Sequence, residues 1–138
     1  MTEVEQFRFS PQRASSNKVI IQITTSEEKW SNRVQIWQPP TDLYETDQAY
    51  IVQVEIAGME AAEFLVSLKS RTLVIQGERY IPSKGQAYYQ MEIPSGEFIT
   101  SVDLPGAIDP SAIEAEYHDG FLRIELTKAK MSKVNVAG

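Results

Sequence analysis

The stretch that decides the fold is Ala115-Glu116-Tyr117-His118-Asp119-Gly120-Phe121-Leu122, which continues as Arg123-Ile124-Glu125-Leu126. Apolar and polar residues alternate on both sides of its centre, which is the period of a strand with one buried face. The apolar positions are Ile113, Ala115 and Tyr117 before the centre, and Leu122, Ile124 and Leu126 after it. Asp119-Gly120 favours a two-residue turn, because glycine readily takes the positive φ of primed hairpin turns. The stretch therefore predicts a β-hairpin.

Outside this hairpin, strand signals recur about every eight to twelve residues, a spacing typical of all-β domains. We expect strands at 43–45, 50–56, 64–68, 73–77 and 98–104. Residues 80–88 predict a loop, and 109–112 are compatible with one helical turn. The pattern predicts an all-β fold, an antiparallel, immunoglobulin-like β-sandwich.

The two ends of the chain differ from this central part. Residues 1–36 are polar with isolated aromatic residues and predict a flexible N-terminal arm. Within the arm, Val19-Ile20-Ile21-Gln22-Ile23 is prone to form a strand, and we expect it to pair elsewhere, with another chain as one option. Pro39-Pro40 sets the boundary, so that the domain covers 37–128 and a C-terminal extension covers 129–138.

The formal net charge of −6 is unevenly distributed, because the arm carries +1 and residues from Trp37 onward carry −7. An acidic domain argues against nucleic acid as a partner, since phosphate binding needs clustered Lys and Arg. The chain has no cysteine, which is compatible with a reducing compartment. No apolar run reaches the length of a membrane span, and the first residues lack the features of a signal peptide. We expect a cytoplasmic protein with no membrane partner.

Enzyme chemistry finds little support in the residues. His118 is the only histidine, and its position beside Asp119-Gly120 favours an exposed turn residue over a base or a metal ligand. Glu114 and Glu116 alternate with apolar residues, which places them on a solvated face rather than across a cleft. No glycine-rich phosphate loop is present. We therefore expect no catalytic residue, no metal, no cofactor and no ATP use.

Several motifs carry a resemblance to a known family. Ala115, Gly120 and Leu122 form the order A-x-x-x-x-G-x-L, which resembles the signature of the small heat-shock proteins, the alpha-crystallin domain family. Upstream motifs agree in order and spacing: Pro39-x-x-Asp42-x-x-Glu45, Ala57-Gly58, Leu73-x-Ile75-x-Gly77-Glu78-Arg79, Gly96-x-Phe98 and Leu104-Pro105. The resemblance covers Trp37 to Lys128. The chain departs from the family at Thr100, where many members carry arginine, and it lacks their aromatic-proline motifs near the N-terminus.

The resemblance implies an ATP-independent chaperone, active in stress, that holds partly unfolded client proteins and prevents their aggregation. Apolar residues of the arm would bind clients, namely Phe7, Phe9, Ile21 and Trp30. For Trp30, packing of the arm onto the sandwich is an equally good interpretation. An alternative function is a co-chaperone or adaptor of the CS-domain type, which shares the sandwich and acts as a monomer.

The resemblance also implies a homo-oligomer built from dimers. In related chains the 80–88 loop carries a strand to the first strand of a partner, which would make Leu43, Tyr44, Tyr80 and Tyr88 dimer contacts. The loop is short for such an exchange, so the strand swap stays open. Val134 and Val136 resemble the family's C-terminal V-x-V motif, which docks into a groove of a neighbouring domain; a frayed tail is the alternative. The expected groove walls are Val66, Leu68, Ile113 and Ala115.

Overall fold

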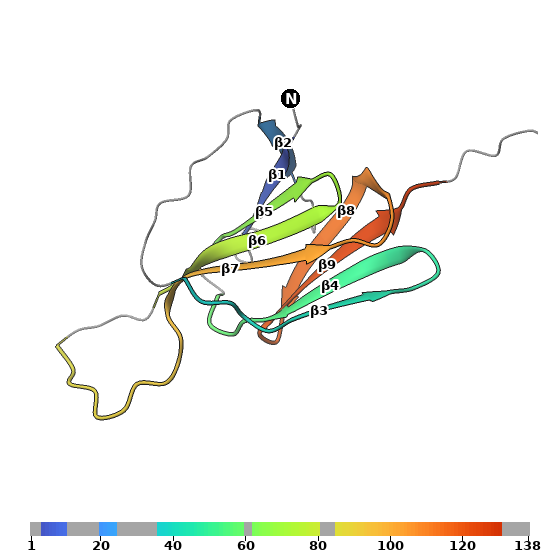
Figure 1. Ribbon diagram of the computed structural model, residues 1–138. Helices are drawn as coiled ribbons and strands as arrows, with labels where there is room; N and C mark the ends of the chain where they lie inside the picture. The colour runs from blue at the N-terminus through green and yellow to red at the C-terminus, as the bar shows by residue number, and fades with distance from the viewer. Residues whose placement is uncertain (1–3, 11–19, 25–35, 60–61, 81–84, 131–138) are drawn as a thin grey trace, which may run out of the picture.

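Among the residues that the structure describes, nine strands form two antiparallel sheets that pack face to face (Figure 1). The structure is a computed structural model that describes residues 4–10, 20–24, 36–59, 62–80 and 85–130, with backbone alone for 4, 5 and 20–24. The strands are β1 (Val4–Phe9), β2 (Ile20–Thr24), β3 (Thr41–Glu45), β4 (Ala49–Glu55), β5 (Phe64–Lys69), β6 (Thr72–Arg79), β7 (Gly96–Asp103), β8 (Ile108–His118) and β9 (Phe121–Lys128). One sheet has the order β2-β1-β5-β6-β7 and the other β3-β4-β9-β8. The predicted all-β sandwich is confirmed.

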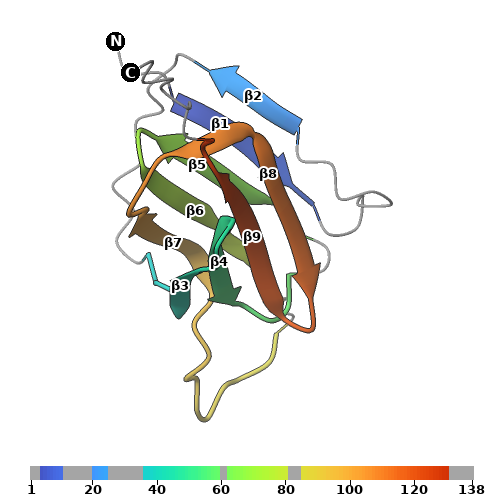
Figure 2. The ribbon, with the colours of Figure 1, turned by 90° about the vertical axis from the view of Figure 1, so that its right-hand side faces the viewer.

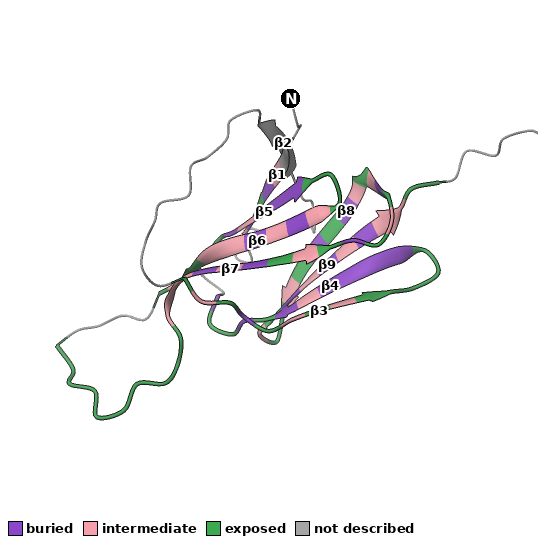
Figure 3. Ribbon diagram, in the orientation of Figure 1, coloured by how far each residue is buried: buried purple, intermediate pink, exposed green. Residues whose placement is uncertain are grey.

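The core lies between the two sheets, where the apolar positions of each alternating pattern meet (Figure 3). On β4, Tyr50, Val52 and Val54 are at most 7% exposed. The predicted apolar face of β5 and β6 is buried in the same way, with Phe64, Val66, Leu73 and Ile75 at 0%. Alternation along each strand therefore sorts the side chains into a core face and a solvent face.

The β8–β9 hairpin has the predicted turn. Asp119 and Gly120 both have positive φ, 52° and 81°, as a primed two-residue turn requires. Leu122 and Ile124, the first residues of the alternating apolar face after the turn, are fully buried. The Gly120 carbonyl accepts a hydrogen bond from the Ile56 amide at 2.8 Å, which ties the turn to the end of β4.

Two contacts fix how the sheets lie on each other. The hydroxyls of Thr41 on β3 and Thr100 on β7 are 2.7 Å apart, and the rings of Phe64 on β5 and Tyr117 on β8 are 5.7 Å apart. The first contact places the β3 edge over β7, and the second places the β8 edge over β5. Thr100, the departure from the family pattern, is thus a 2% exposed residue whose hydroxyl has a partner across the sandwich.

The structure corrects the expectation for the start of the chain. Residues 4–9, treated as part of an arm without regular structure, form β1 and pair antiparallel with β5. The 20–24 segment, for which another chain was one option, forms β2 and pairs with β1 of the same chain. The side chains of Phe7 and Phe9 lie on the inner face of this sheet extension, 1% and 5% exposed. Burial of two aromatic side chains explains why a polar segment adopts a strand here.

The helical turn expected at 109–112 is also wrong, because these residues belong to β8. The pairing of β8 with β9 is irregular between Ile108 and Ile113. In this irregular part, Asp109 Oδ1 accepts hydrogen bonds from the Ser111 amide and hydroxyl, at 3.0 and 2.6 Å. The local side-chain bonds suit a β-bulge as well as a helical turn, which is why the sequence did not separate the two.

Residues 85–95, between β6 and β7, project away from both sheets as a loop (Figures 1 and 2). Its base is held by Arg79, whose guanidinium donates to the Pro94 carbonyl and lies 4.4 Å from the centre of the Trp37 ring. Trp37 is in turn bound to β7, since its amide donates to Glu97 and its carbonyl accepts from Ile99. The start of the domain and the base of the loop therefore stabilise each other.

Candidate assembly and client-binding site

The four predicted groove walls lie on two strands, β5 and β8, and all four are buried. Val66 and Leu68 on β5 and Ile113 and Ala115 on β8 belong to one apolar cluster and are at most 6% exposed. The two strands are in different sheets, and β8 is the edge of its sheet. We call the space bounded by these four residues the β5–β8 slot. Its role as a docking site for the tail stays a prediction.

β1 of the same chain pairs with the edge of β5 opposite to β6, beside the β5–β8 slot. Phe7 lies opposite Val66 and Phe9 lies opposite Phe64 in the β1–β5 register. Side chains of directly opposite residues share one face of a sheet, so both phenylalanines point to the core. The Phe9 and Phe64 rings are 6.2 Å apart and tilted by 32°. In Figure 2, β8 lies in front, and β1 and β5 lie behind it in the other sheet.

Of the predicted client-binding residues, the structure describes the side chains of Phe7 and Phe9. Both are buried, so client contact requires β1 to leave β5. Ile21 lies in β2, of which the backbone is described, and Trp30 lies outside the described residues. Client binding by these four residues stays a prediction, as does docking by Val134 and Val136, which also lie outside the described part.

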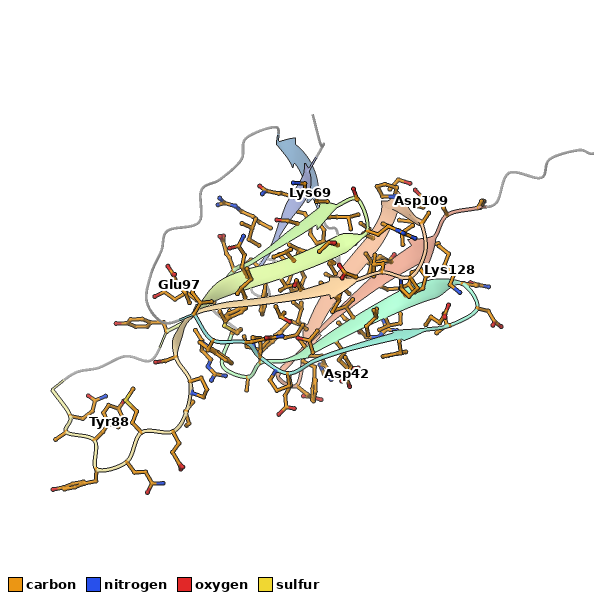
Figure 4. The ribbon with its side chains drawn as sticks, viewed as in Figure 1. Asp42, Lys69, Tyr88, Glu97, Asp109 and Lys128 are labelled. Carbon is orange, nitrogen blue, oxygen red and sulfur yellow. The ribbon has the colours of Figure 1, made fainter. Side chains whose placement is uncertain are left out.

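The predicted dimer contacts lie at two exposed places. Leu43 and Tyr44 are on β3, the second edge of its sheet, where Tyr44 is 45% exposed. Tyr80 and Tyr88 are on the projecting loop, 74% and 49% exposed; Figure 4 shows Tyr88 far from the sandwich. In the single chain these two groups do not meet.

Three further exposed apolar residues were missed by the dimer prediction: Tyr89, Met91 and Ile93. They stand at alternate positions, so an extended backbone points them to one side. The signal is visible in the sequence, because polar Gln90 and Glu92 separate them. A strand that lacks a partner within its own chain leaves such an apolar face exposed.

A small polar network lies beside the β3 edge, on the outer face of the β3-β4-β9-β8 sheet. Burial disfavours the charge of Arg123, but hydrogen bonds to Tyr44 and Glu125 outweigh it and raise the pKa of the guanidinium above its ordinary value. Lys128 Nζ lies 2.8 Å from Glu45 Oε2, and this bond raises the pKa of the lysine. These contacts join side chains of β3 to side chains of β9, across β4.

The residues weighed as a base or as metal ligands can be placed in the described part of the chain. His118 has an 83% exposed side chain, 3.0 Å from the equally exposed Asp119. Between residues 36 and 130, apart from 60–61 and 81–84, and in the described N-terminal segments, no three His, Asp or Glu side chains gather as metal ligands. The same residues include no helix that is long and apolar enough to cross a membrane.

Comparison with known proteins agrees with this geometry. The model of the Hsp20/alpha crystallin family matches residues 42–136. Small heat shock protein C2 of Rickettsia felis is 32% identical over 105 residues, which cover 72% of this chain and 68% of the relative. The 17.6 kDa class II heat shock protein of Arabidopsis thaliana is 33% identical over 93 residues, 64% of this chain and 60% of the relative.

Solved structures show the same fold. Heat shock protein 16.0 from Schizosaccharomyces pombe has a TM-score of 0.60 at 27% identity, covering 76% of this chain and 77% of that one. HSP18.5 from E. histolytica has a TM-score of 0.60 at 25% identity, covering 74% and 99%. With the sandwich, the hairpin signature and a family match over most of its length, the chain belongs to the Hsp20/alpha crystallin family of small heat shock proteins, which are chaperones.

Proposed function

We propose that the protein is an ATP-independent holdase, which binds partly unfolded client proteins in the cytoplasm and keeps them from aggregating. The observation that carries this proposal is the position of Phe7 and Phe9. Their strand pairs with the domain through β5 alone. Apolar surface that is covered at rest and released on demand is what a holdase needs, because permanently exposed patches make a protein aggregate. The acidic domain keeps a client complex soluble.

The functional unit in this proposal is a dimer joined through the projecting loop. The face formed by Tyr89, Met91 and Ile93 would add as a strand to β3 of a second copy, beside Leu43 and Tyr44. Two observations support it: the three side chains are 104%, 60% and 67% exposed, and β3 is an unpaired sheet edge among the described strands. Strand addition to an edge satisfies backbone groups on both partners.

Larger assemblies would form when the tail of one subunit docks into another. Val134 and Val136 would point to the same side of an extended chain, and the expected walls, which include Ala115, are apolar. Two valines contribute at most about 1.5–3 kcal/mol each, so a single contact is reversible. The small heat-shock protein of Xylella fastidiosa, whose crystal structure reveals a distinct high order structure, has the same fold with a TM-score of 0.61.

A turbidity assay tests the holdase proposal. An unrelated enzyme is heated with a stoichiometric amount of the protein, with and without ATP. We expect suppressed light scattering in both cases, because the sequence has no glycine-rich phosphate loop. Equal turbidity with and without the protein would refute the proposal. A monomer by light scattering would favour the adaptor instead.

A further inference from the structure

The β5–β8 slot has two candidate occupants within one sequence. We propose that Phe7-Arg8-Phe9 occupies, in its own subunit, the slot that Val134-Asn135-Val136 of a second copy would enter. Tail docking and release of β1 are then one linked step: the tail binds a subunit only after β1 has left. This inference rests on the proposed assembly through the tail, and it adds what controls that assembly.

The backbone pairing supports exclusion. All six residues of β5 have partners on both sides, from Phe64 to Lys69 with β1 and again with β6. A docking segment that pairs with the β5 edge therefore finds no unpaired backbone while β1 is in place. The side chains agree with this, because Phe7 and Phe9 are 1% and 5% exposed and lie in the same apolar cluster as the four slot walls.

The two segments also match in pattern. Each places large apolar residues at i and i+2 around one polar residue, so each presents two knobs on one side of an extended chain. Phenylalanine buries more area than valine, and β1 is tethered to its own slot, which gives it a high effective concentration. Both effects favour β1 in an isolated subunit. Binding of the tail becomes more favourable when many subunits offer several contacts at once.

The exchange has a consequence for client binding. When β1 leaves, β5 keeps its pairing with β6, so the rest of the sheet retains its hydrogen bonds. Phe7 and Phe9, which are predicted to bind clients, become exposed in the same event. Assembly by tails and exposure of the client-binding residues would thus rise together in the population of subunits.

An engineered disulfide tests the inference directly, because the chain has no cysteine of its own. Arg8 and Leu65 are opposite each other in the β1–β5 register, exposed and half-buried on the outer face, so Arg8→Cys with Leu65→Cys locks β1 onto β5 when oxidised. The probe is a fluorescent peptide of residues 130–138. We expect oxidation to weaken its binding by roughly tenfold or more, a typical coupling factor, and to shift the particle to dimers, with reduction restoring both.

The matched control is Gln76→Cys with Ile99→Cys, an opposite pair on β6 and β7. Its oxidation locks strands that stay paired in either state, so peptide binding and particle size should be the same before and after.

The inference is overturned if the oxidised Arg8–Leu65 variant binds the peptide as tightly as its reduced form, or if neither form binds it. Aggregation suppression is measured separately. Redox-gated binding of the peptide without suppression would refute the holdase proposal and leave this inference standing.

Discussion

At the scale of single residues, Gly120 carries the β8–β9 turn. Its φ is +81°, and a Cβ built there would lie 3.3 Å from the Ala57 side chain. A β-branched residue is therefore opposed by both backbone strain and a tight contact. We expect Gly120→Val to lower the free energy of unfolding by more than the roughly 1 kcal/mol typical of a point mutation, measured by urea denaturation.

The neighbouring residue supplies the control. Asp119 also has positive φ, 52°, and its side chain is exposed. Asparagine tolerates this conformation as well as aspartate does. Asp119→Asn should stay within about 0.5 kcal/mol of the wild type. An unchanged melting temperature for Gly120→Val would mean that the turn does not need positive φ at this position.

Asp109 gives a pH-dependent contribution to stability. Hydrogen bonds from the Ser111 hydroxyl and amide lower the pKa of the Asp109 carboxyl below 3.8. A carboxylate with a lowered pKa in the folded state stabilises the protein above its unfolded pKa, and this contribution is lost as the pH falls through the lowered value. We expect Ser111→Ala to move the pKa of Asp109 back toward 3.8, followed by NMR titration of the carboxyl carbon. A pKa that stays in place would show that the amide bond alone sets it.

At the scale of elements, the sequence predicted the strands whose alternation is long and whose partner is adjacent. The β8–β9 hairpin is the clearest case, because its turn residues and both alternating runs lie in one stretch. β1 was missed because two apolar residues, Phe7 and Phe9, give a weak pattern, and because its core partner β5 lies more than 50 residues away. Nothing local in the sequence specifies such a distant pairing.

For the β5–β8 slot, too, one part was predicted from the sequence and another part was not. Its four walls were predicted from resemblance and alternation, and all four are buried in the core cluster, while their role as a docking groove stays a prediction. The occupant was not predicted, because burial of Phe7 and Phe9 depends on a tertiary contact rather than on a local pattern. Tyr89, Met91 and Ile93 had a visible alternating pattern, but the dimer contact was predicted for the 80–88 loop just before them.

Arg79 connects three elements, and its geometry predicts a specific sensitivity. Its guanidinium donates to Pro94 at the loop base and to Ala57 after β4, while lying over the Trp37 ring. A lysine keeps the charge, but one ammonium cannot replace a planar fork that bonds and stacks at once. We expect Arg79→Lys to lower the unfolding free energy by about 1 kcal/mol, measured by urea denaturation.

Arg71→Lys is the matched control, since Arg71 makes one exposed hydrogen bond, to the Pro105 carbonyl at 3.2 Å. Its effect should lie within about 0.5 kcal/mol. If both variants have the stability of the wild type, the stacked arginine does not hold the loop base.

At the scale of the whole molecule, the exposed face of the projecting loop predicts the dimer contact. Met91→Asp with Ile93→Asp places two charges where apolar side chains would be buried in a partner, and an unpaired buried charge is strongly unfavourable. We expect dimers to dissociate into monomers in sedimentation experiments, with an unchanged melting curve, because both residues are exposed in the subunit. Gln90→Asp, on the opposite side of the segment, should leave the dimer intact. Dimers that persist in the double variant would place the interface elsewhere.

The remaining prediction concerns the first 36 residues, whose removal tests whether 37–128 is a domain in its own right. The deletion removes β1 and β2 and opens the slot. Losing the burial of Phe7 and Phe9 costs about 3–6 kcal/mol together, at about 1.5–3 kcal/mol for each side chain. A typical domain has about 5–15 kcal/mol of stability, so we expect a weaker but cooperative β-type melt, with reduced suppression of aggregation.

Docking of the tail would restore part of the lost stability, because the opened slot would accept Val134 and Val136 of another copy. The stability of the truncated chain should therefore rise with protein concentration, as expected when association stabilises the folded state. Adding Val134→Ser and Val136→Ser should remove that concentration dependence in thermal melts. An unfolded truncated chain would move the domain boundary to include β1. A folded chain whose melting temperature ignores both concentration and the two valines would show that the slot closes on itself rather than taking the tail.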